Sequence, residues 1–280
     1  MVRNPLAALL VCFSAALVAF PAPADKPKAA PATSPKLDVA RLKRTLETGS
    51  EAERLSALTE LATTPPDGAP AASAVVSELL VRGATVRVLE KALETLEKLA
   101  QPAASPAIAP YARHRTAALR RSATLALART GGPAAVTALR AVLRGSDQAL
   151  RRRAASALRD LKAADAVGDL FAVLGKDVPE AAGAIGELCT PTDCQKLVEQ
   201  LGKMPFDVMQ SGLEPIVLRP DSEIPEALKL DLLDRLGRLQ TKEASVFLKT
   251  VRARFPKDGN ARIRAALEAA VSGRPVKPTP

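Results

Sequence analysis

The chain has 280 residues, and 47% of them are hydrophobic, which supplies enough apolar surface for a folded core and excludes a wholly disordered protein. These residues are chiefly Ala, Leu and Val, with 2% aromatic residues and no Trp, which favours closely packed helices over a β-sandwich or a pocket lined with rings. The formal net charge of +10 directs attention to acidic partners.

The N-terminal residues predict a secretory signal peptide over 1–24. Arg3 precedes an apolar run of 15 residues, and Ala22-Pro23-Ala24 follows it, as in signal peptides with a small-residue cleavage site. The run is shorter than the roughly 20 residues that span a bilayer, although an uncleaved anchor is an alternative. Val11 before Cys12 argues against a lipoprotein signal. We expect an exported protein, periplasmic or extracellular, or membrane-anchored if the signal is retained.

The next segment, 25–36, is rich in Ala, Pro and Lys, with a proline at every fourth position. Such a composition cannot form a core and predicts an extended, semi-stiff linker. The C-terminal residues 272–280, SGRPVKPTP, are likewise expected to be a disordered tail. The folded part should therefore lie within 37–271.

Within that part the sequence repeats itself. Residues 120–143 match residues 151–174 at a constant offset of 31, and 89–112 follow the same register. The apolar positions that coincide are Ala92, Ala123 and Ala154; Leu96, Leu127 and Leu158; Ala104, Ala135 and Ala166; and Ile108, Leu139 and Leu170. Their spacings of 3, 4 and 7 predict two amphipathic helices per unit, joined by a short polar or Gly-Pro connection.

The best copy of this unit resembles the short HEAT-like repeat, also called the phycobilisome-lyase repeat. The matching residues are Asp147, Leu150-Arg151, Ala154, Ala157-Leu158 and Ala166-Val167, and weaker copies begin at Ser50 and Asp258. The resemblance implies an all-α fold, a right-handed α-solenoid of HEAT-like helix pairs with repeats of about 31 residues. About six or seven pairs would form one domain. Residues 188–239 depart from the pattern, and the repeat boundaries there cannot be assigned from the sequence.

Two cysteines, Cys189 and Cys194, are left once the signal peptide is removed. In an exported chain such a pair suits a disulfide across a short loop between helices, provided that the Cα atoms approach within about 7 Å. Two free buried thiols are the alternative. A metal site has little support, because there is no further cysteine and the single histidine is distant in sequence.

Catalysis has little support in the sequence. His114 and Tyr111 are the only residues of their types, and there is no Gly-rich phosphate loop, GxSxG or HExxH motif. A lone histidine lacks the partners that a metal site or an acid–base pair needs, so His114 is predicted to be a surface residue. We therefore expect a protein that is not an enzyme and has no catalytic residue, metal or cofactor, although a repeat-based enzyme with an unrecognised site is a further alternative.

The positive charge is concentrated in the central repeats. Between Arg113 and Arg159 there are eleven arginines and one acidic residue, Asp147. Because residues one period apart lie side by side in a solenoid, these arginines predict a basic ridge. Its candidate members are Arg113, Arg115, Arg120, Arg121, Arg151, Arg152 and Arg153.

The first arginine of each repeat motif also has a structural interpretation. The resemblance implies that this arginine bonds to loop carbonyls or to an acidic turn residue of the neighbouring repeat. The residues concerned are Arg54, Arg120, Arg151 and Arg262. The other arginines of the ridge have two interpretations. They can bind an acidic partner, since Arg suits recognition of carboxylate or phosphate, or they can serve only to keep the protein soluble.

Export and the scarcity of aromatic side chains disfavour nucleic acid as the partner. An acidic protein surface, an anionic lipid headgroup or an anionic envelope polymer is left. The sequence thus favours a protein-binding scaffold in a bacterial-type cell envelope whose basic ridge orients an acidic partner. The alternative is a binder of the anionic membrane surface or of an envelope polymer.

Overall fold

The computed structural model describes residues 38–274. Within this range it contains α-helices and short 3-10 helices but no β-strand, in agreement with the all-α fold predicted from the sequence. The predicted signal peptide and the 25–36 linker lie outside the described residues, as does the tail beyond Arg274. The first helix begins at Val39 and the last ends at Val271.

The helices are short and follow one another with brief connections. The α-helices are α1 (Val39–Thr48), α2 (Glu51–Leu61), α3 (Ala69–Arg82), α4 (Val86–Leu99), α5 (Ser105–Ile108), α6 (Ala117–Thr130), α7 (Gly132–Leu143), α8 (Gln148–Asp160), α9 (Val167–Val173), α10 (Glu180–Leu188), α11 (Pro191–Val198), α12 (Phe206–Leu218), α13 (Glu226–Leu239), α14 (Lys242–Arg254) and α15 (Ala261–Val271). The 3-10 helices are η1 (Pro66–Gly68), η2 (Pro102–Ala104), η3 (Ala109–Arg113) and η4 (Ala164–Ala166).

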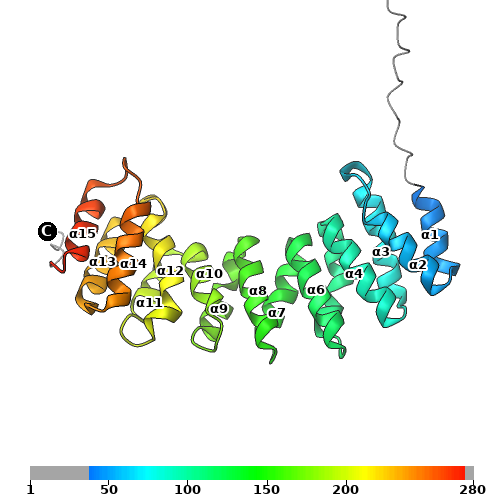
Figure 1. Cartoon of the computed structure of the whole chain (residues 1–280), viewed down its shortest axis with the longest axis horizontal. Helices are drawn as coiled ribbons and strands as arrows, with labels where there is room; N and C mark the ends of the chain where they lie inside the picture. The colour runs from blue at the N-terminus through cyan, green and yellow to red at the C-terminus, as the bar shows by residue number, and fades with distance from the viewer. Residues whose placement is uncertain (1–37, 275–280) are drawn as a thin grey trace, which may run out of the picture. The chain divides into compact units, whose positions relative to one another are not determined.

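The helices form two layers (Figure 1). Successive even-numbered helices contact one another from α2 to α14, and the odd-numbered helices do so from α1 to α9 and from α11 to α15. Each helix also packs against a neighbour of the other layer, as α3 does against α4 and α7 against α8. This is the arrangement of an α-solenoid, in which every pair buries its apolar face against the next pair.

The 31-residue repeat is confirmed by the helix starts. The N-cap residues of α4, α6 and α8 are Thr85, Thr116 and Asp147, each 31 residues after the last. The Asp147 carboxylate accepts a hydrogen bond from the Leu150 amide at 3.1 Å, which satisfies one of the free amides at the start of α8. The equivalent Ala and Leu positions predicted from the sequence are all buried in these three units.

The packing changes character in the second half of the domain. Helices α10 and α12 approach so closely that a Cβ added at Gly186 would lie 2.0 Å from the Gly212 carbonyl oxygen. Only glycine on both helices permits this separation, since any other residue would place its Cβ inside the partner backbone. This contact and the loop 219–225 explain why residues 188–239 depart from the regular repeat.

Ion pairs join neighbouring helices of one layer. Arg140 of α7 lies 2.5 Å from the carboxylate of Asp169 in α9, and Arg144 lies 3.0 Å from the same group. Burial raises the pKa of Asp169, but the hydrogen bonds from the two arginines outweigh it and leave the pKa below its ordinary value. Asp169 therefore contributes to the cohesion of two repeats.

We expect Asp169→Asn to lower the free energy of unfolding by about 1–2 kcal/mol at pH 7. A carboxylate with a lowered folded pKa stabilises the fold above its unfolded pKa of about 3.9, and this contribution is lost as the pH falls through the folded pKa. The difference between wild type and variant should thus be constant from pH 7 to 5 and shrink toward pH 2, as measured by urea unfolding. Asp165→Asn, at a position whose side chain is 65% exposed, is the control with little expected effect. A difference that stayed the same at pH 2 would contradict the assignment.

Candidate functional site

The arginines of the repeat motif differ in whether they form hydrogen bonds within the chain. Arg54 donates to the Glu47 carbonyl at 3.0 Å, and Arg120 donates to the carbonyls of His114 and Arg115 at 3.0 and 2.9 Å. Each of these two arginines lies four residues after the N-cap of its helix and ties the preceding loop to that helix. These bonds are the ones expected from the structural interpretation, so Arg120 is engaged within the chain.

In the last repeat Arg262 bonds to an acidic turn residue of the neighbouring repeat, Glu226, as expected, while a second arginine, Arg264, holds the preceding loop. The N-cap of α15 is Asn260, whose side chain accepts from the amides of Arg262 and Ile263, and the residue four positions later is Arg264. Arg264 donates to the carbonyls of the preceding loop at Pro256, Lys257 and Gly259. Arg262 pairs with Glu226 of α13 at 2.8 Å.

Arg151 and Arg152 differ although they are adjacent. The Arg151 Nε atom is buried and has no hydrogen-bond partner among residues 38–274. Arg152 points to the next helix of its layer, where it lies 2.7 Å from the Glu180 carboxylate of α10. Burial raises the pKa of Glu180, but the bond from Arg152 more than compensates, and the net pKa is lowered.

Four arginines of the predicted ridge are exposed and form no ion pair with any carboxylate in the described range. They are Arg113, Arg115, Arg121 and Arg153. We call them the outer arginines. Arg121 precedes Arg152 by one period, and the position equivalent to Glu180 is occupied by Ala149. The α6–α8 step therefore lacks the carboxylate that neutralises Arg152 in the α8–α10 step.

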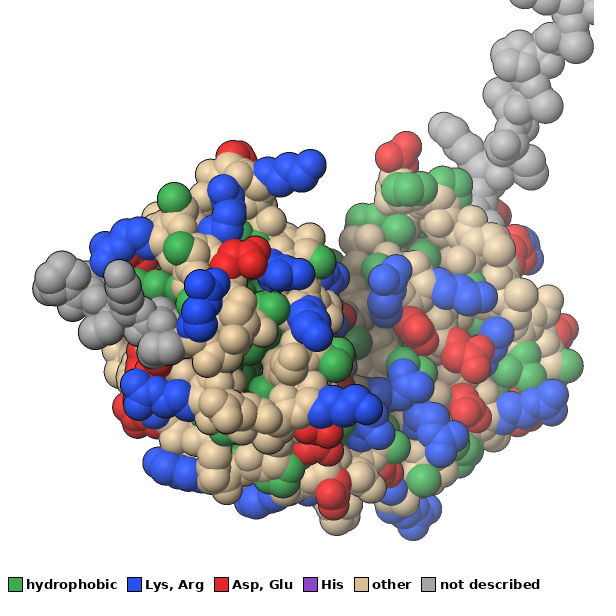
Figure 2. Space-filling view, turned by 60° about the vertical axis from the view of Figure 1, so that its left-hand side comes forward, with side chains coloured by type: hydrophobic (Ala, Val, Ile, Leu, Met, Phe, Trp, Pro, Cys, Tyr) green, Lys and Arg blue, Asp and Glu red, His purple; other side chains and the backbone are tan. Residues whose placement is uncertain are grey.

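Three of the remaining arginines of this segment pair with carboxylates, whereas Arg129 is exposed and forms no ion pair within residues 38–274. Arg140 and Arg144 pair with Asp169, and Arg159 pairs with Asp160 and Glu187. On the face drawn in Figure 2, basic and acidic side chains are interspersed. The uniform ridge expected from the sequence is thus reduced to the outer arginines.

A groove of 440 Å³ lies beside Arg153 on the even-numbered layer. It is lined by Thr124, Leu125 and Ala128 of α6, by Ala149, Arg152, Arg153, Ser156, Ala157 and Asp160 of α8, and by Glu180. The Ser156 hydroxyl and two guanidinium groups therefore share one concave surface with two carboxylates and a few small apolar side chains. Such a surface can bind a carboxylate through charge-assisted hydrogen bonds.

His114 is half-buried, at the surface of the domain just before α6. Its ring stacks on Tyr111 with the centroids 5.9 Å apart, and its Nδ1 atom accepts from the Thr116 amide at 3.1 Å. The Tyr111 hydroxyl donates to the Leu80 carbonyl at 2.6 Å, and burial raises the pKa of this phenol. The pair holds the loop before α6, close in sequence to Arg113 and Arg115.

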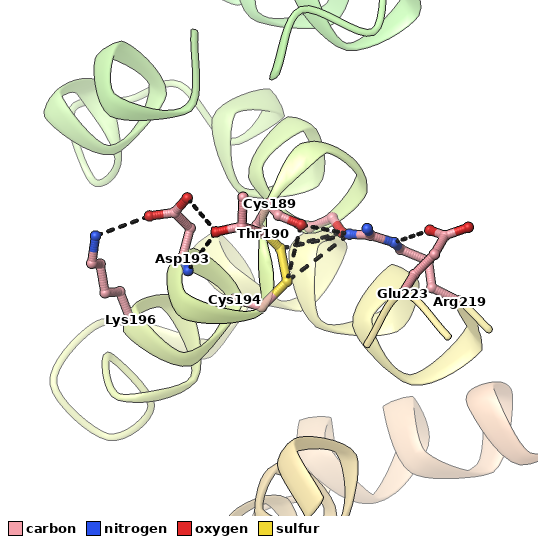
Figure 3. Close-up of a disulfide and its surroundings, with 8 residues drawn as sticks. Cys189, Thr190, Asp193, Cys194, Lys196, Arg219 and Glu223 are labelled. Atoms are coloured by element: carbon pink, nitrogen blue, oxygen red, sulfur yellow. Dashed lines mark hydrogen bonds and ion pairs between the residues drawn. A yellow bond between two sulfur atoms is a disulfide. The ribbon is translucent and has the colours of Figure 1, made fainter. Parts of the chain in front are cut away.

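Cys189 and Cys194 are joined by a disulfide, with their Cα atoms 5.3 Å apart. Cys189 is the C-cap of α10 and Cys194 lies in α11, so the bond crosses the connection between these helices, and both residues are buried. The guanidinium group of Arg219 lies beside the two sulfur atoms (Figure 3). The sequence predicted the pairing partners but gave no sign of Arg219, which is 25 residues away.

A second groove, of 650 Å³, was not predicted from the sequence. It lies between α12 and α14 and includes Phe206, Phe247 and Val246. The two rings meet edge to face with centroids 5.6 Å apart, and Val246 is 55% exposed. The aromatic residues are too few and too far apart in sequence to reveal that they meet.

Among residues 38–274, no cluster of His, Cys, Asp or Glu side chains has the arrangement of a metal site. None of the helices in this range is both long and apolar enough to cross a membrane.

Residues 73–159 match the family model for HEAT repeats. No curated protein matches the chain. Similar solved structures include the complex of CpcE and CpcF of phycocyanin lyase from Nostoc sp. PCC7120, at 16% identity and a TM-score of 0.45, covering 89% of this chain and 98% of that one. An engineered protein is 20% identical with a TM-score of 0.47, covering 84% and 72%. A designed armadillo repeat protein in complex with the peptide (KR)4 is 15% identical with a TM-score of 0.41, covering 84% and 99%. Residues 73–159 therefore carry HEAT repeats, and the described helix pairs stack as an α-solenoid.

Proposed function

We propose that this chain is a non-enzymatic scaffold of the cell envelope and that its outer arginines bind an acidic partner protein. The observation that carries the proposal is that Arg113, Arg115, Arg121 and Arg153 are exposed without a carboxylate partner in the described range. Most other arginines of the central repeats are used within the chain. A solenoid that leaves such groups free offers a long surface on which a partner can be oriented.

The groove beside Arg153 favours a protein carboxylate as the group that is bound. Ser156 can donate a hydrogen bond there, and Arg153 supplies a planar pair of donors. Glu180 forms an ion pair with Arg152 and adds a negative charge to the lining of the groove. A densely charged polymer would be repelled at that point, whereas separate Asp or Glu side chains can avoid it.

The envelope location rests on the N-terminal sequence, which has the order of a secretory signal. The proposal of a protein without enzymatic activity rests on the repeat fold, which serves to present surfaces and carries no chemistry by itself. The few aromatic side chains offer little for stacking of bases, which supports a protein partner over nucleic acid.

The test is a binding experiment with the full chain and a variant in which the four outer arginines are changed to Gln. Envelope proteins are captured at low and moderate salt, and every captured protein is then purified and titrated by calorimetry. We expect a discrete acidic protein to bind the wild type saturably and the variant at least about tenfold more weakly, since four charge-assisted contacts are removed.

The matched control changes four exposed lysines elsewhere, Lys203, Lys242, Lys249 and Lys257, to Gln, so that the loss of net charge is equal. This control should bind the same partner with little change. Equal weakening by both variants would show a general charge effect. Binding only to vesicles with anionic lipids or to polyglutamate, abolished by salt in all three proteins, would favour the membrane or polymer alternative and reject the scaffold.

A further inference from the structure

The disulfide is the origin of a continuous polar network that reaches the last helix. Arg219, just after α12, donates from one guanidinium nitrogen to the carbonyls of Cys189 and Gly186 at 3.0 and 3.3 Å. The same nitrogen lies 3.8 Å from the Cys189 sulfur and 4.0 Å from the Cys194 sulfur. Its Nε atom pairs with Glu223 at 2.9 Å (Figure 3). One side chain thus contacts the disulfide and the loop 219–225.

The network continues through a buried lysine. Lys229 of α13 is only 2% exposed, and its ammonium group donates to the Arg219 carbonyl and, at 2.6 Å, to the Asp221 carboxylate. A lysine is buried to this extent only where its charge is paired and hydrogen-bonded. The hydrogen bonds from Lys229 and Asn260 lower the pKa of Asp221, so this carboxylate remains charged at neutral pH.

Asn260 carries the network to α15. Its amide nitrogen donates to Asp221 and to Glu226, both at 2.7 Å, while its oxygen caps α15. Glu226 in turn pairs with Arg262. The contacts therefore run without a break from the disulfide, through Arg219 and Lys229, to the first turn of the last helix.

We propose that the Cys189–Cys194 disulfide is a redox-responsive clip whose reduction loosens the Arg219 network and, with it, the loop 219–225 and the start of α15. The bond fixes the Cys189 carbonyl at the end of α10, which is where Arg219 is anchored. Without the bond the end of α10 and the start of α11 are held only by weaker contacts. This proposal does not depend on the outer arginines or on their partner.

The reductant is a dithiol. One of its thiolates attacks a protein sulfur, the S–S bond breaks, and the electron pair goes to the other protein sulfur. The second thiol of the reagent then attacks the mixed disulfide and releases the attacked protein sulfur as a thiolate, so the protein gains two electrons and two protons and the reagent leaves as a cyclic disulfide. Because both sulfurs are buried, attack requires local opening. The sulfur that leaves as a thiolate is beside the Arg219 guanidinium, which stabilises it and favours the reduced state.

The first measurement is the reduction equilibrium of the full chain, with Cys12 changed to Ser in every variant. The proteins are equilibrated with mixtures of reduced and oxidised dithiothreitol, and the free thiols are then alkylated. Mass spectrometry gives the fraction of protein in which the disulfide is reduced. Arg219→Gln removes the charge beside the sulfurs and Arg219→Lys retains it, so the Gln variant should favour the disulfide about tenfold more than the Lys variant. Arg235→Gln, which breaks an exposed pair within α13, is the control and should match the wild type.

The second measurement is hydrogen exchange of the same proteins. Reduction of the wild type should increase exchange in 219–229 and 258–264 at least several-fold, while α4 to α8 stay unchanged. A Cys189→Ser, Cys194→Ser variant should show the increased exchange under all redox conditions. Equal reduction equilibria for the Gln and Lys variants, or unchanged exchange after reduction, would overturn the proposal. If the Gln variant does not fold, the double serine variant still decides the exchange test.

Discussion

Gly186→Ala is expected to lower the free energy of unfolding by about 3 kcal/mol or more, since the new methyl group overlaps atoms that cannot move aside. The added Cβ would lie 2.0 Å from the Gly212 oxygen and 2.7 Å from the Gly212 carbonyl carbon. Both are backbone atoms of α12, so relief requires α10 and α12 to separate. Separation would also disturb the contact of Arg219 with the carbonyls at the end of α10.

Chemical unfolding monitored by circular dichroism measures this effect, with Gly168→Ala as the matched control. Gly168 is an exposed residue of α9, and a Cβ there would meet no atom within 4 Å. The control should be unchanged or stabilised by up to about 1 kcal/mol, because alanine is the better helix former.

The reciprocal variant Gly212→Ala, whose Cβ would lie 2.3 Å from the Ala182 oxygen, should be as damaging as Gly186→Ala. Stabilities of Gly186→Ala and Gly168→Ala within 1 kcal/mol of each other would show that α10 and α12 are farther apart than described.

The close contact of α10 and α12 also shows what the sequence could not predict. The Ala and Leu positions of the central repeats recur at intervals of 31, so their burial could be predicted from periodicity alone. Gly186 and Gly212 have no counterparts at that interval. Glycine is required at these two positions because α10 and α12 lie so close together, and the distance between two helices cannot be inferred from the pattern of residues along the chain.

The arginine surface was predictable in composition but not in detail. The excess of arginine between residues 113 and 159 is plain in the sequence, whereas most of its neutralisation comes from acids that lie 25, 28 or 29 residues later, as Glu180 does for Arg152. These spacings are shorter than the repeat, because each arginine reaches across to the first turn or two of a later helix. The four outer arginines are distinguished only when these partners are known.

Leu127→Ala is expected to cost about 3 kcal/mol, within the range for a leucine truncated in a rigid core. Leu127 of α6 is fully buried, and the even-numbered helices α4 and α8 pack on either side of α6. The neighbouring repeats place leucines at the same level, so the cavity cannot be filled by a small shift of one side chain. Leu96→Ala and Leu158→Ala, one period away on either side, should therefore cost a similar amount.

The distribution of this loss along the chain tests the solenoid itself. Because each repeat contacts only its neighbours, destabilisation should spread by nearest-neighbour contacts and decay with distance. Hydrogen exchange of Leu127→Ala should increase most in α4, α6 and α8 and least in α13 to α15. The control is Leu125→Ala, at a half-buried position in the groove of the same helix, which should lower the free energy of unfolding by at most about 1 kcal/mol. A uniform increase up to α15 would mean that the repeats unfold as one cooperative unit. The locality expected here is also what would let the disulfide loosen the C-terminal helices while the outer arginines in α6 and α8 stay in place.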